Sequence, residues 1–450
     1  MTRQHWKRWS VRTTARRPGP WRLLSRAALA AAVASAAAIA VGATPGMSGA
    51  SSGATLEIGM FQAFSGPTAP FGPELAAGCI SAAKAIDRAG GVLGHKIACK
   101  VSDNRGDPAD AVPAADQLIA ATSNLVGVIG PTSGAASATV PIFNRAHVPM
   151  FLDAGQSVFT KTHYQYFWRL FPPDSATGYA MALYAWDHGY RRAAAVFGTD
   201  ISAAGSRGTV VQGFKALGGK IVLNQGIAEN QTSYRSEVAQ VAAAKPQVVF
   251  TEAASQTSAT YWSELKQQAH LVPIIGTDGT TSAVWTEPVS KAVGTATFKK
   301  YYVGVEAYAP TSGPAWQAYK KAVLAAKATI AKPIKPWLSD SYSMGDYDGA
   351  TLIALAMLEA KSTNPVVFNA YIGKIANGVR GAVVVHSFAQ GKAALSKGRK
   401  IRYEGPYGTV HFDKTHNAIG DFEVVAANLT TIVKSLPGTK VEAVKTKASK

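Results

Sequence analysis

After about residue 55, segments with the two-residue periodicity of strands alternate with segments that have the helical periodicity, along most of the chain. Residues 56–61 alternate as in a strand, and 73–88 carry an apolar face at helical spacing. A double glycine at 90–91 ends this helix before the next strand, 96–101. A helix at 109–122 and strands at 125–129 and 149–152 continue the order. Strands that alternate with helices predict a parallel α/β sheet with right-handed crossovers.

A second set of the same units begins after residue 174. Strands are predicted at 193–197, 220–223, 247–251 and 273–275, with helices at 177–188, 206–217, 234–243 and 258–269. Two sets of units predict two lobes. Beyond residue 285 the pattern gives a strand at 297–303, helices at 315–328 and 344–361, and late strands at 408–412 and 421–427. Residues 437–450 read as a polar, basic tail.

The first fifty residues differ from the rest. Eight Lys and Arg residues and no acid lie in positions 1–26, and an apolar run of small residues follows at 27–43. A basic region, then an apolar region, then small residues suited to cleavage are the pattern of a secretory signal. This order predicts a cleaved secretory signal in 1–50. The alternative is a membrane anchor, but 17 mostly alanine residues are short and weakly apolar for a bilayer core of about 30 Å. The mature chain is therefore expected to be periplasmic or extracellular, without insertion into the membrane.

Composition excludes several classes of protein. Of the 450 residues, 47% are hydrophobic and 16% charged, as in chains that bury large cores. Eight of the 46 basic residues belong to the signal, which leaves 38 against 27 acids, a net charge of +11. No segment interleaves basic and aromatic residues, so a solvated surface explains this charge better than nucleic-acid binding.

The two cysteines, Cys79 and Cys99, are predicted in a helix and in the strand that follows it. An oxidising compartment permits one disulfide between them. Two buried free thiols are the alternative, and the spacing matches no metal site.

Motifs of catalysis and of cofactor binding are missing from the sequence. It contains no Walker-type phosphate loop, no GxGxxG after the first strand, no HExxH and no CxxC. The string at 130–134 has the wrong spacing for a nucleophile elbow, and no His or Asp is placed to activate Ser133. We therefore expect a protein that is not an enzyme and that uses no cofactor or metal.

Polar and glycine-rich loops instead follow several predicted strands, at the edge where open parallel sheets bind ligands. In the first lobe these are the loops at 62–73, 130–137 and 153–157. In the second they are 200–205, 252–256 and 276–279. Together they predict one binding site between the lobes.

Several motifs occur in order through residues 56–279: IGMFQAFSGPTAPFGPELAAGC, AIDRAGGVLGHKIACKVSDNRGDP, VGVIGPTSGAASATVPIFNRAHVPM, YFWRLFPPDSATGYAMALY, KPQVVF and VPIIGTDG. With these motifs the stretch resembles the type I periplasmic binding proteins, specifically the leucine/isoleucine/valine-binding branch of branched-chain amino acid ABC importers. The later SYSMGDYDGATLIALAML and GTVHFD are similar to the family's closing segments.

This resemblance implies an α/β fold of two Rossmann-like lobes with parallel central sheets, joined by a three-strand hinge. The N-terminal lobe is expected at 54–171 and 290–405, and the C-terminal lobe at 172–285 and 415–436, before the basic tail at 437–450. The resemblance also implies hinge closure on a small ligand, without chemistry, and a membrane ABC permease as partner.

The family's ligand contacts fall on residues of both lobes. Phe71 is similar to the aromatic wall against the ligand side chain. Ser133 and Gly134 match the loop that receives a carboxylate, and Ala154, Gly155 and Gln156 match the main-chain and hydroxyl contacts to carboxylate and amine. Asp278 matches the acidic residue near the ammonium group, where a charge-assisted hydrogen bond fixes its orientation.

Two positions depart from the family's pattern. Its tyrosine in the fourth loop falls at Ala204, and its aromatic cluster after PDVVF is replaced by TEAA, in which Glu252 is available to a cationic or hydroxylated group. The expected ligand is an amino acid or a related small amide or carboxylate. The competing functions are a ligand sensor that acts through a separate receptor or regulator, and an enzyme built on paired lobes, for which only Glu252 and Asp278 are candidate acids.

Overall fold

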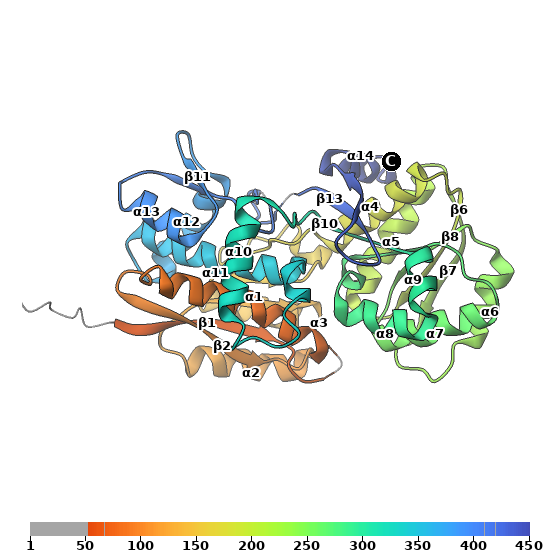
Figure 1. The fold of residues 1–450 in the computed structure, drawn as a ribbon, viewed down its shortest axis with the longest axis horizontal. Helices are drawn as coiled ribbons and strands as arrows, with labels where there is room; N and C mark the ends of the chain where they lie inside the picture. The colour runs from red at the N-terminus through yellow and green to blue at the C-terminus, as the bar shows by residue number, and fades with distance from the viewer. Residues whose placement is uncertain (1–52, 67, 409, 419) are drawn as a thin grey trace, which may run out of the picture. The chain divides into compact units, whose positions relative to one another are not determined.

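The computed structural model describes residues 53–450 except 67, 409 and 419 (Figure 1). The predicted signal segment, 1–50, lies outside the described residues. Strands and helices alternate through 53–301, as the hydrophobic pattern predicted. Among the described helices, none has the length and apolar character needed to cross a bilayer.

The first sheet is parallel, with its strands in the order β2-β1-β3-β4-β5. The strands are β1 (Gly53–Gln62), β2 (His95–Asp103), β3 (Leu125–Thr132), β4 (Met150–Asp153) and β5 (Phe167–Trp168). Its connecting helices are α1 (Gly72–Arg88), α2 (Pro108–Ala120) and α3 (Ser133–Arg145).

Different helices cover the two faces of this sheet, because successive strand residues point to opposite sides. In β1, Ile58 and Met60 pack into the core on the α1 side, whereas Phe61 packs into the core under α2 and α3. Four later helices return to the α1 side, where α10 and α11 lie beside α1 (Figure 1). These are α10 (Gly313–Ala326), α11 (Ser341–Ala360), α12 (Pro365–Asn377) and α13 (Phe388–Leu395), with a short parallel pair, β11 (Val383–Val385) and β12 (Ile401–Tyr403).

The second sheet has the order β14-β13-β10-β9-β8-β6-β7, and only β13 and β14 run antiparallel to their neighbours in the described residues. Its strands are β6 (Arg192–Gly198), β7 (Lys220–Ile227), β8 (Val248–Glu252), β9 (Ile274–Gly276), β10 (Tyr302–Ala307), β13 (Phe422–Ala426) and β14 (Ile432–Leu436).

Helices cover both faces of the second sheet too. In β6, Ala193, Ala195 and Phe197 face one core, and Ala194 and Val196 face the other. The first core lies under α4 (Asp174–Asp187), α5 (Ile201–Ala216) and α14 (Gly438–Ala448). The second lies under α6 (Arg235–Ala244), α7 (Ser255–Gln267), α8 (Ala283–Val293) and α9 (Thr295–Tyr301). The predicted α/β fold of two lobes is confirmed.

The chain passes three times from one sheet to the other. The crossings run from β5 to α4, from β10 to α10, and from β12 to β13. Each lobe is therefore assembled from segments that are distant in sequence.

The structure differs from the predicted elements in three places. The sequence assigned 290–405 to the first lobe, but β10 hydrogen-bonds to β9 and β13 and lies inside the second sheet. It also placed a strand at 297–303, where α9 precedes β10. Residues 437–450 are not a free tail: α14 packs on α4 and α5, with Val441 and Val444 buried.

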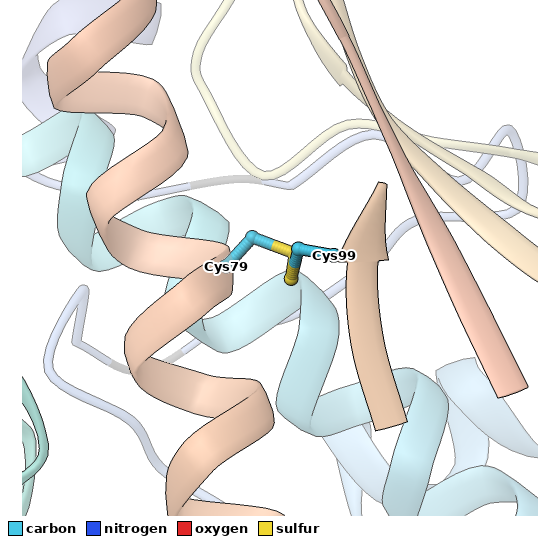
Figure 2. The surroundings of a disulfide bond; sticks show 2 residues. All are labelled: Cys79 and Cys99. Atoms are coloured by element: carbon cyan, nitrogen blue, oxygen red, sulfur yellow. A yellow bond between two sulfur atoms is a disulfide. The ribbon is translucent and has the colours of Figure 1, made fainter. Parts of the chain in front are cut away.

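Cys79 and Cys99 form a disulfide between α1 and β2 (Figure 2). Their Cα atoms are 6.1 Å apart, a usual separation for a disulfide, and Cys79 is fully buried. Of the two states that the sequence left open, the structure has the bonded one. The link fixes α1 to the edge strand of the first sheet.

Replacing both cysteines with alanine should lower the free energy of unfolding by about 3 kcal/mol, the chain-entropy value for a loop of this length. The cysteines are 20 positions apart. Urea unfolding of the double variant, beside wild type with and without reductant, measures the loss. Reductant should lower the wild-type midpoint and leave the variant's unchanged. A wild-type midpoint indifferent to reductant would contradict a stabilising link.

Candidate functional site

Polar residues of both lobes lie where strands end. In the first lobe, β3 leads directly into α3 at Ser133, and β4 leads into the loop 154–156. In the second, β8 ends at Glu252 and Asp278 follows β9. This edge of a parallel sheet is the usual place for a ligand.

The start of α3 presents backbone donors. Ser133 is the first residue of the helix, whose first-turn N–H groups have no partner within the helix. Gly134 is exposed, and a Cβ there would collide with the backbone carbonyl of Gly106. This close approach of the Gly106 backbone requires glycine at 134.

Gln156 braces the two loops of the first lobe. Its Nε2 donates to the Ser133 carbonyl at 2.9 Å, and its Oε1 accepts from Ser137 at 3.2 Å. Arg169 donates to the Gln156 carbonyl at 2.9 Å. The side chain is buried, with both polar ends satisfied by protein. Its observed role is to hold the loops together.

The loop at 154–156 also contacts the first helix of the second lobe. Ala154 is buried, and the Gly155 carbonyl accepts from the backbone N–H of Asp174 at 2.8 Å. A Cβ at Gly155 would clash with the Asp174 carboxylate. Glycine at 155 thus allows Asp174 to lie directly against the loop.

Two residues assigned from the resemblance lie outside these contacts. Phe71 ends the 3₁₀ turn η1 (Ala69–Phe71) and is half-buried against the first core. Ala204 is exposed in the first turn of α5, where its methyl group offers no polar atom. Neither joins the hydrogen-bonded network around Asp278 in the described structure.

Four carboxylates of the second lobe influence one another: Asp174, Asp200, Glu252 and Asp278. Asp174 begins α4, and Asp200 caps α5 by accepting from the N–H groups of Ser202 and Ala203 at 3.0 and 3.1 Å. Asp174 and Glu252 are buried, at 5% and 9% exposure, and Asp278 is half-buried. We call these four residues the acidic quartet.

Burial disfavours charge on three members of the quartet. It raises the pKa of Glu252 well above its usual value, and the negative charges of Asp200 and Asp278 add to the effect. Burial likewise raises the pKa of Asp174, where nearby Arg169 acts in the opposite direction. Burial raises the pKa of Asp278 too, against a lowering hydrogen bond from Tyr342. An incoming positive charge would restore the ionised forms.

Tyr342 connects the lobes at this point. It lies on α11, which packs in the first lobe, and its hydroxyl donates to Oδ2 of Asp278 at 3.1 Å. Its ring stacks on Phe171 with centroids 4.8 Å apart, and Phe171 meets Tyr407 edge-on at 5.0 Å. Three aromatic rings therefore lie next to the quartet.

A second set of acids lies in the first lobe. Gln62 donates to Asp153 at the end of β4, and the charge of Asp153 acts on the buried carboxyl of Asp346 on α11. Burial raises the pKa of Asp153 to about 7. Glu74 is 1% exposed, and both its carboxylate oxygens are buried without a hydrogen-bond partner. Among the described residues, no three His, Cys, Asp or Glu side chains are grouped as metal ligands.

The sequence interpretation missed three residues of this region: Asp174, Tyr342 and Tyr407. The first two stand inside motifs that carried the family resemblance, RLFPPD and SYSMGDYDG. Tyr407 follows them by a long interval, on the third crossing. Only the fold brings these positions together, since Tyr342 and Asp278 are 64 residues apart.

A sequence model of the family described as periplasmic binding protein matches residues 55–431. The match spans most of the chain, so the chain belongs to this family. The resemblance to periplasmic binding proteins drawn from the sequence motifs is thereby confirmed. The family consists of binding proteins, which confirms the expectation that this protein is not an enzyme.

Two curated relatives match over shorter stretches. A Leu/Ile/Val-binding protein homolog 3 of Brucella melitensis is 36% identical over 66 residues, 15% of this chain and 18% of the relative. A Leu/Ile/Val-binding protein of Rhizobium johnstonii is 33% identical over 84 residues, 18% of this chain and 22% of the relative. The chain thus spans about a fifth of the length of these relatives.

Solved structures agree with the fold over most of the chain. The leucine-binding protein LivK of Thermotoga maritima has a TM-score of 0.68 at 18% identity, covering 86% of this chain and all of that one. LivJ of Streptococcus pneumoniae, solved with isoleucine, has 0.68 at 19%, covering 85% and 99%. A solute-binding protein of R. palustris, solved with benzoate, has 0.67 at 19%, covering 85% and 97%.

Proposed function

We propose that this protein is the extracytoplasmic solute-binding component of an ABC importer, which captures a small polar solute by hinge closure and delivers it to a membrane permease. The observation that carries the proposal is the hydrogen bond between Tyr342 of one lobe and Asp278 of the other. A hinged protein that closes on a ligand must bring groups of both lobes to one place. Three crossing segments between the lobes supply the hinge.

The ligand is an amino acid or a related amide or carboxylate in this proposal. Backbone N–H groups at Ser133 and Gly134 receive its carboxylate at the start of α3. Main-chain groups of Ala154 and Gly155 and the carboxylate of Asp278 receive its amine. The names of the relatives support this range, since they specify Leu/Ile/Val binding in two cases and a benzoate complex in a third.

Export through a cleaved N-terminal signal is part of the proposal. Membership in a family of periplasmic binding proteins implies a place outside the cytoplasm. The basic and apolar segments within 1–50 are the export signal. Mass spectrometry of the protein recovered from outside the cytoplasm should give an N-terminus in the range of about 44–53. An intact N-terminus would contradict cleavage.

Binding is tested by thermal shift of the purified protein against amino acids, amides, polyamines and small carboxylates. A ligand at about 100 times its Kd stabilises by about 2.7 kcal/mol, which raises Tm by several degrees. Asp278→Ala should abolish that rise, whereas Asp110→Ala, at an exposed carboxylate, should keep it. A well-folded protein whose Tm responds to no class of compound would contradict the proposal.

A further inference from the structure

Several acids are buried in this protein, although its net charge is basic. Ten Asp and Glu residues of the described chain are buried. The salt bridges found among the described residues involve only Glu57, Asp110, Glu404 and Glu442, none of them among those ten. Burying a carboxylate in its charged form without a positive partner costs free energy. None of the ten buried acids has a salt bridge within the described protein that would balance its negative charge.

The nearest cation to the acidic quartet is already engaged elsewhere. Arg169 is fully buried, and its Nε donates to Asn417 at 2.7 Å. Its other nitrogens donate to the carbonyls of Ala154 and Gln156 and to the Thr160 hydroxyl. It forms no ion pair with Asp174 within 4 Å. The quartet therefore lacks a positively charged partner from the described protein.

Two acceptor atoms at this site are buried without a hydrogen-bond partner. One is Oδ2 of Asp174, which is 5% exposed. The other is the hydroxyl of Tyr407, a 6% exposed residue on a different segment, close enough to Asp278 and Glu306 for their charges to act on it. Native proteins rarely leave buried polar atoms unpaired, so each of these atoms lacks a hydrogen-bonding partner that a ligand could supply: a donor for Asp174, and a donor or an acceptor for Tyr407.

Two of the quartet's carboxylates lie directly against glycines. A Cβ at Gly205 would lie 3.0 Å from Oδ2 of Asp174, and one at Gly279 would lie 3.1 Å from Oε1 of Glu252. Any larger residue would place its side chain over these oxygens. Glycine at 205 and 279 therefore lets the backbone lie this close to the buried carboxylates.

The rings beside the quartet favour a positive charge as well. Phe171, Tyr342 and Tyr407 form one aromatic group, and Tyr342 hydrogen-bonds to Asp278. The face of an aromatic ring attracts a cation, and carboxylates with aromatic rings form the usual pocket for amines and their derivatives. A neutral aliphatic ligand would leave all these carboxylates unpaired.

We propose that the ligand is an organic cation with more ammonium or guanidinium groups than carboxylates, such as a diamine, a polyamine or a basic amino acid, and that Asp174, Glu252 and Asp278 bind its positive groups. This inference rests on the proposed solute-binding function; it narrows the amino acids of that proposal to basic ones and extends the range to diamines and polyamines, which carry no carboxylate. Glu252 stands where the family resemblance led us to expect aromatic residues that contact the ligand. An acid in place of these residues would change which ligands the site prefers. Asp278 then binds one positive group of the ligand, and Asp174 and Glu252 bind the others.

The test is calorimetric titration of the purified protein with putrescine, spermidine, agmatine, lysine and arginine, beside leucine, glutamine and 4-hydroxybenzoate. We expect saturable binding of at least one cationic compound and none of the neutral or anionic ones. Glu252→Gln and Asp278→Asn should each weaken that binding thirtyfold or more, as expected when one partner of a buried charge pair is removed. Asp110→Asn, at an exposed carboxylate, is the matched control and should bind as wild type.

The unliganded variants distinguish lost binding from lost folding. Replacing a buried carboxylate that has no ion-pair partner with its amide removes a charge without orphaning another, so the apo Tm of Glu252→Gln should equal or exceed that of wild type. Binding of leucine or 4-hydroxybenzoate without binding of any cation would overturn the substrate class and leave the solute-binding function standing. No binding of any compound by a folded protein would overturn both.

Discussion

Replacing Arg169 with leucine should lower the free energy of unfolding by about 3–5 kcal/mol, because several buried acceptors lose a charged donor, at about 1–3 kcal/mol each. Arg169 is fully buried at the first crossing, and its guanidinium holds Asn417 of the third crossing and the loop carbonyls at 154 and 156. Without it, these acceptors lose their donors and Asp174 loses its nearest positive charge. Urea unfolding monitored by circular dichroism measures the loss.

Two further substitutions make the experiment specific. Arg105→Leu removes an exposed guanidinium whose ion pair with Asp110 spans 3.8 Å, and should cost no more than about 1 kcal/mol. Arg169→Lys keeps the charge but not the planar set of donors. Its loss in the free energy of unfolding should therefore fall between the losses of Arg169→Leu and Arg105→Leu. If the free energies of unfolding of Arg169→Leu and Arg105→Leu differ by less than about 1 kcal/mol, the Arg169 guanidinium does not hold the crossings together.

Stability should fall as the pH rises from 5 to 8, because several buried carboxyls have raised pKa values in the folded protein. Burial raises the pKa of Asp340 to about 6, of Asp153 and Glu423 to about 7, and of Asp348 to about 8. The folded state therefore holds more protons than the unfolded state from about pH 4 upward. The stabilisation is complete below the unfolded pKa and is lost as the pH rises through each folded pKa.

Between its unfolded and folded pKa, each carboxyl that still holds its proton in the folded protein contributes a slope of about 1.4 kcal/mol per pH unit, and we expect a total loss of several kcal/mol. His416 acts in the opposite direction, since burial lowers its pKa, but it is one group against several. Differential scanning calorimetry from pH 5 to 8 checks the trend. Asp153→Asn should flatten the profile and Asp110→Asn should not. A Tm that rises steadily over this range would contradict the assignment.

The order of strands and helices could be predicted because each element carries its own local signal. The alternation at 56–61 places Ile58 and Met60 on one face of β1, and the structure has them in one core. The partner of a strand carries no such signal. The apolar residues of β10 suit either sheet, and only pairing with β9 and β13 assigns the strand to the second lobe.

The candidate site divides in a similar way. Loops at strand ends could be predicted, because a parallel sheet brings them to one edge. The sequence interpretation treated Gln156 as a ligand group, but its amide is engaged by Ser133 and Ser137. The hydrogen bond from Tyr342 to Asp278 depends on where α11 packs, which no local pattern specifies. At the end of the chain a usable signal was present: Val441 and Val444 are at helical spacing and are both buried.

The three crossings also determine when each lobe can be completed as the polypeptide emerges from the ribosome. β10 lies in the interior of the second sheet, yet one of its neighbours, β13, begins only at Phe422. Until those residues appear, β10 has an open edge, with backbone donors and acceptors that no strand has yet paired. The first lobe is also completed late, because the helices α10 to α13 that cover one face of its sheet lie late in the chain. Neither lobe is finished until most of the polypeptide has been made, so a truncated product lacking 422–450 would expose a sheet edge prone to aggregation.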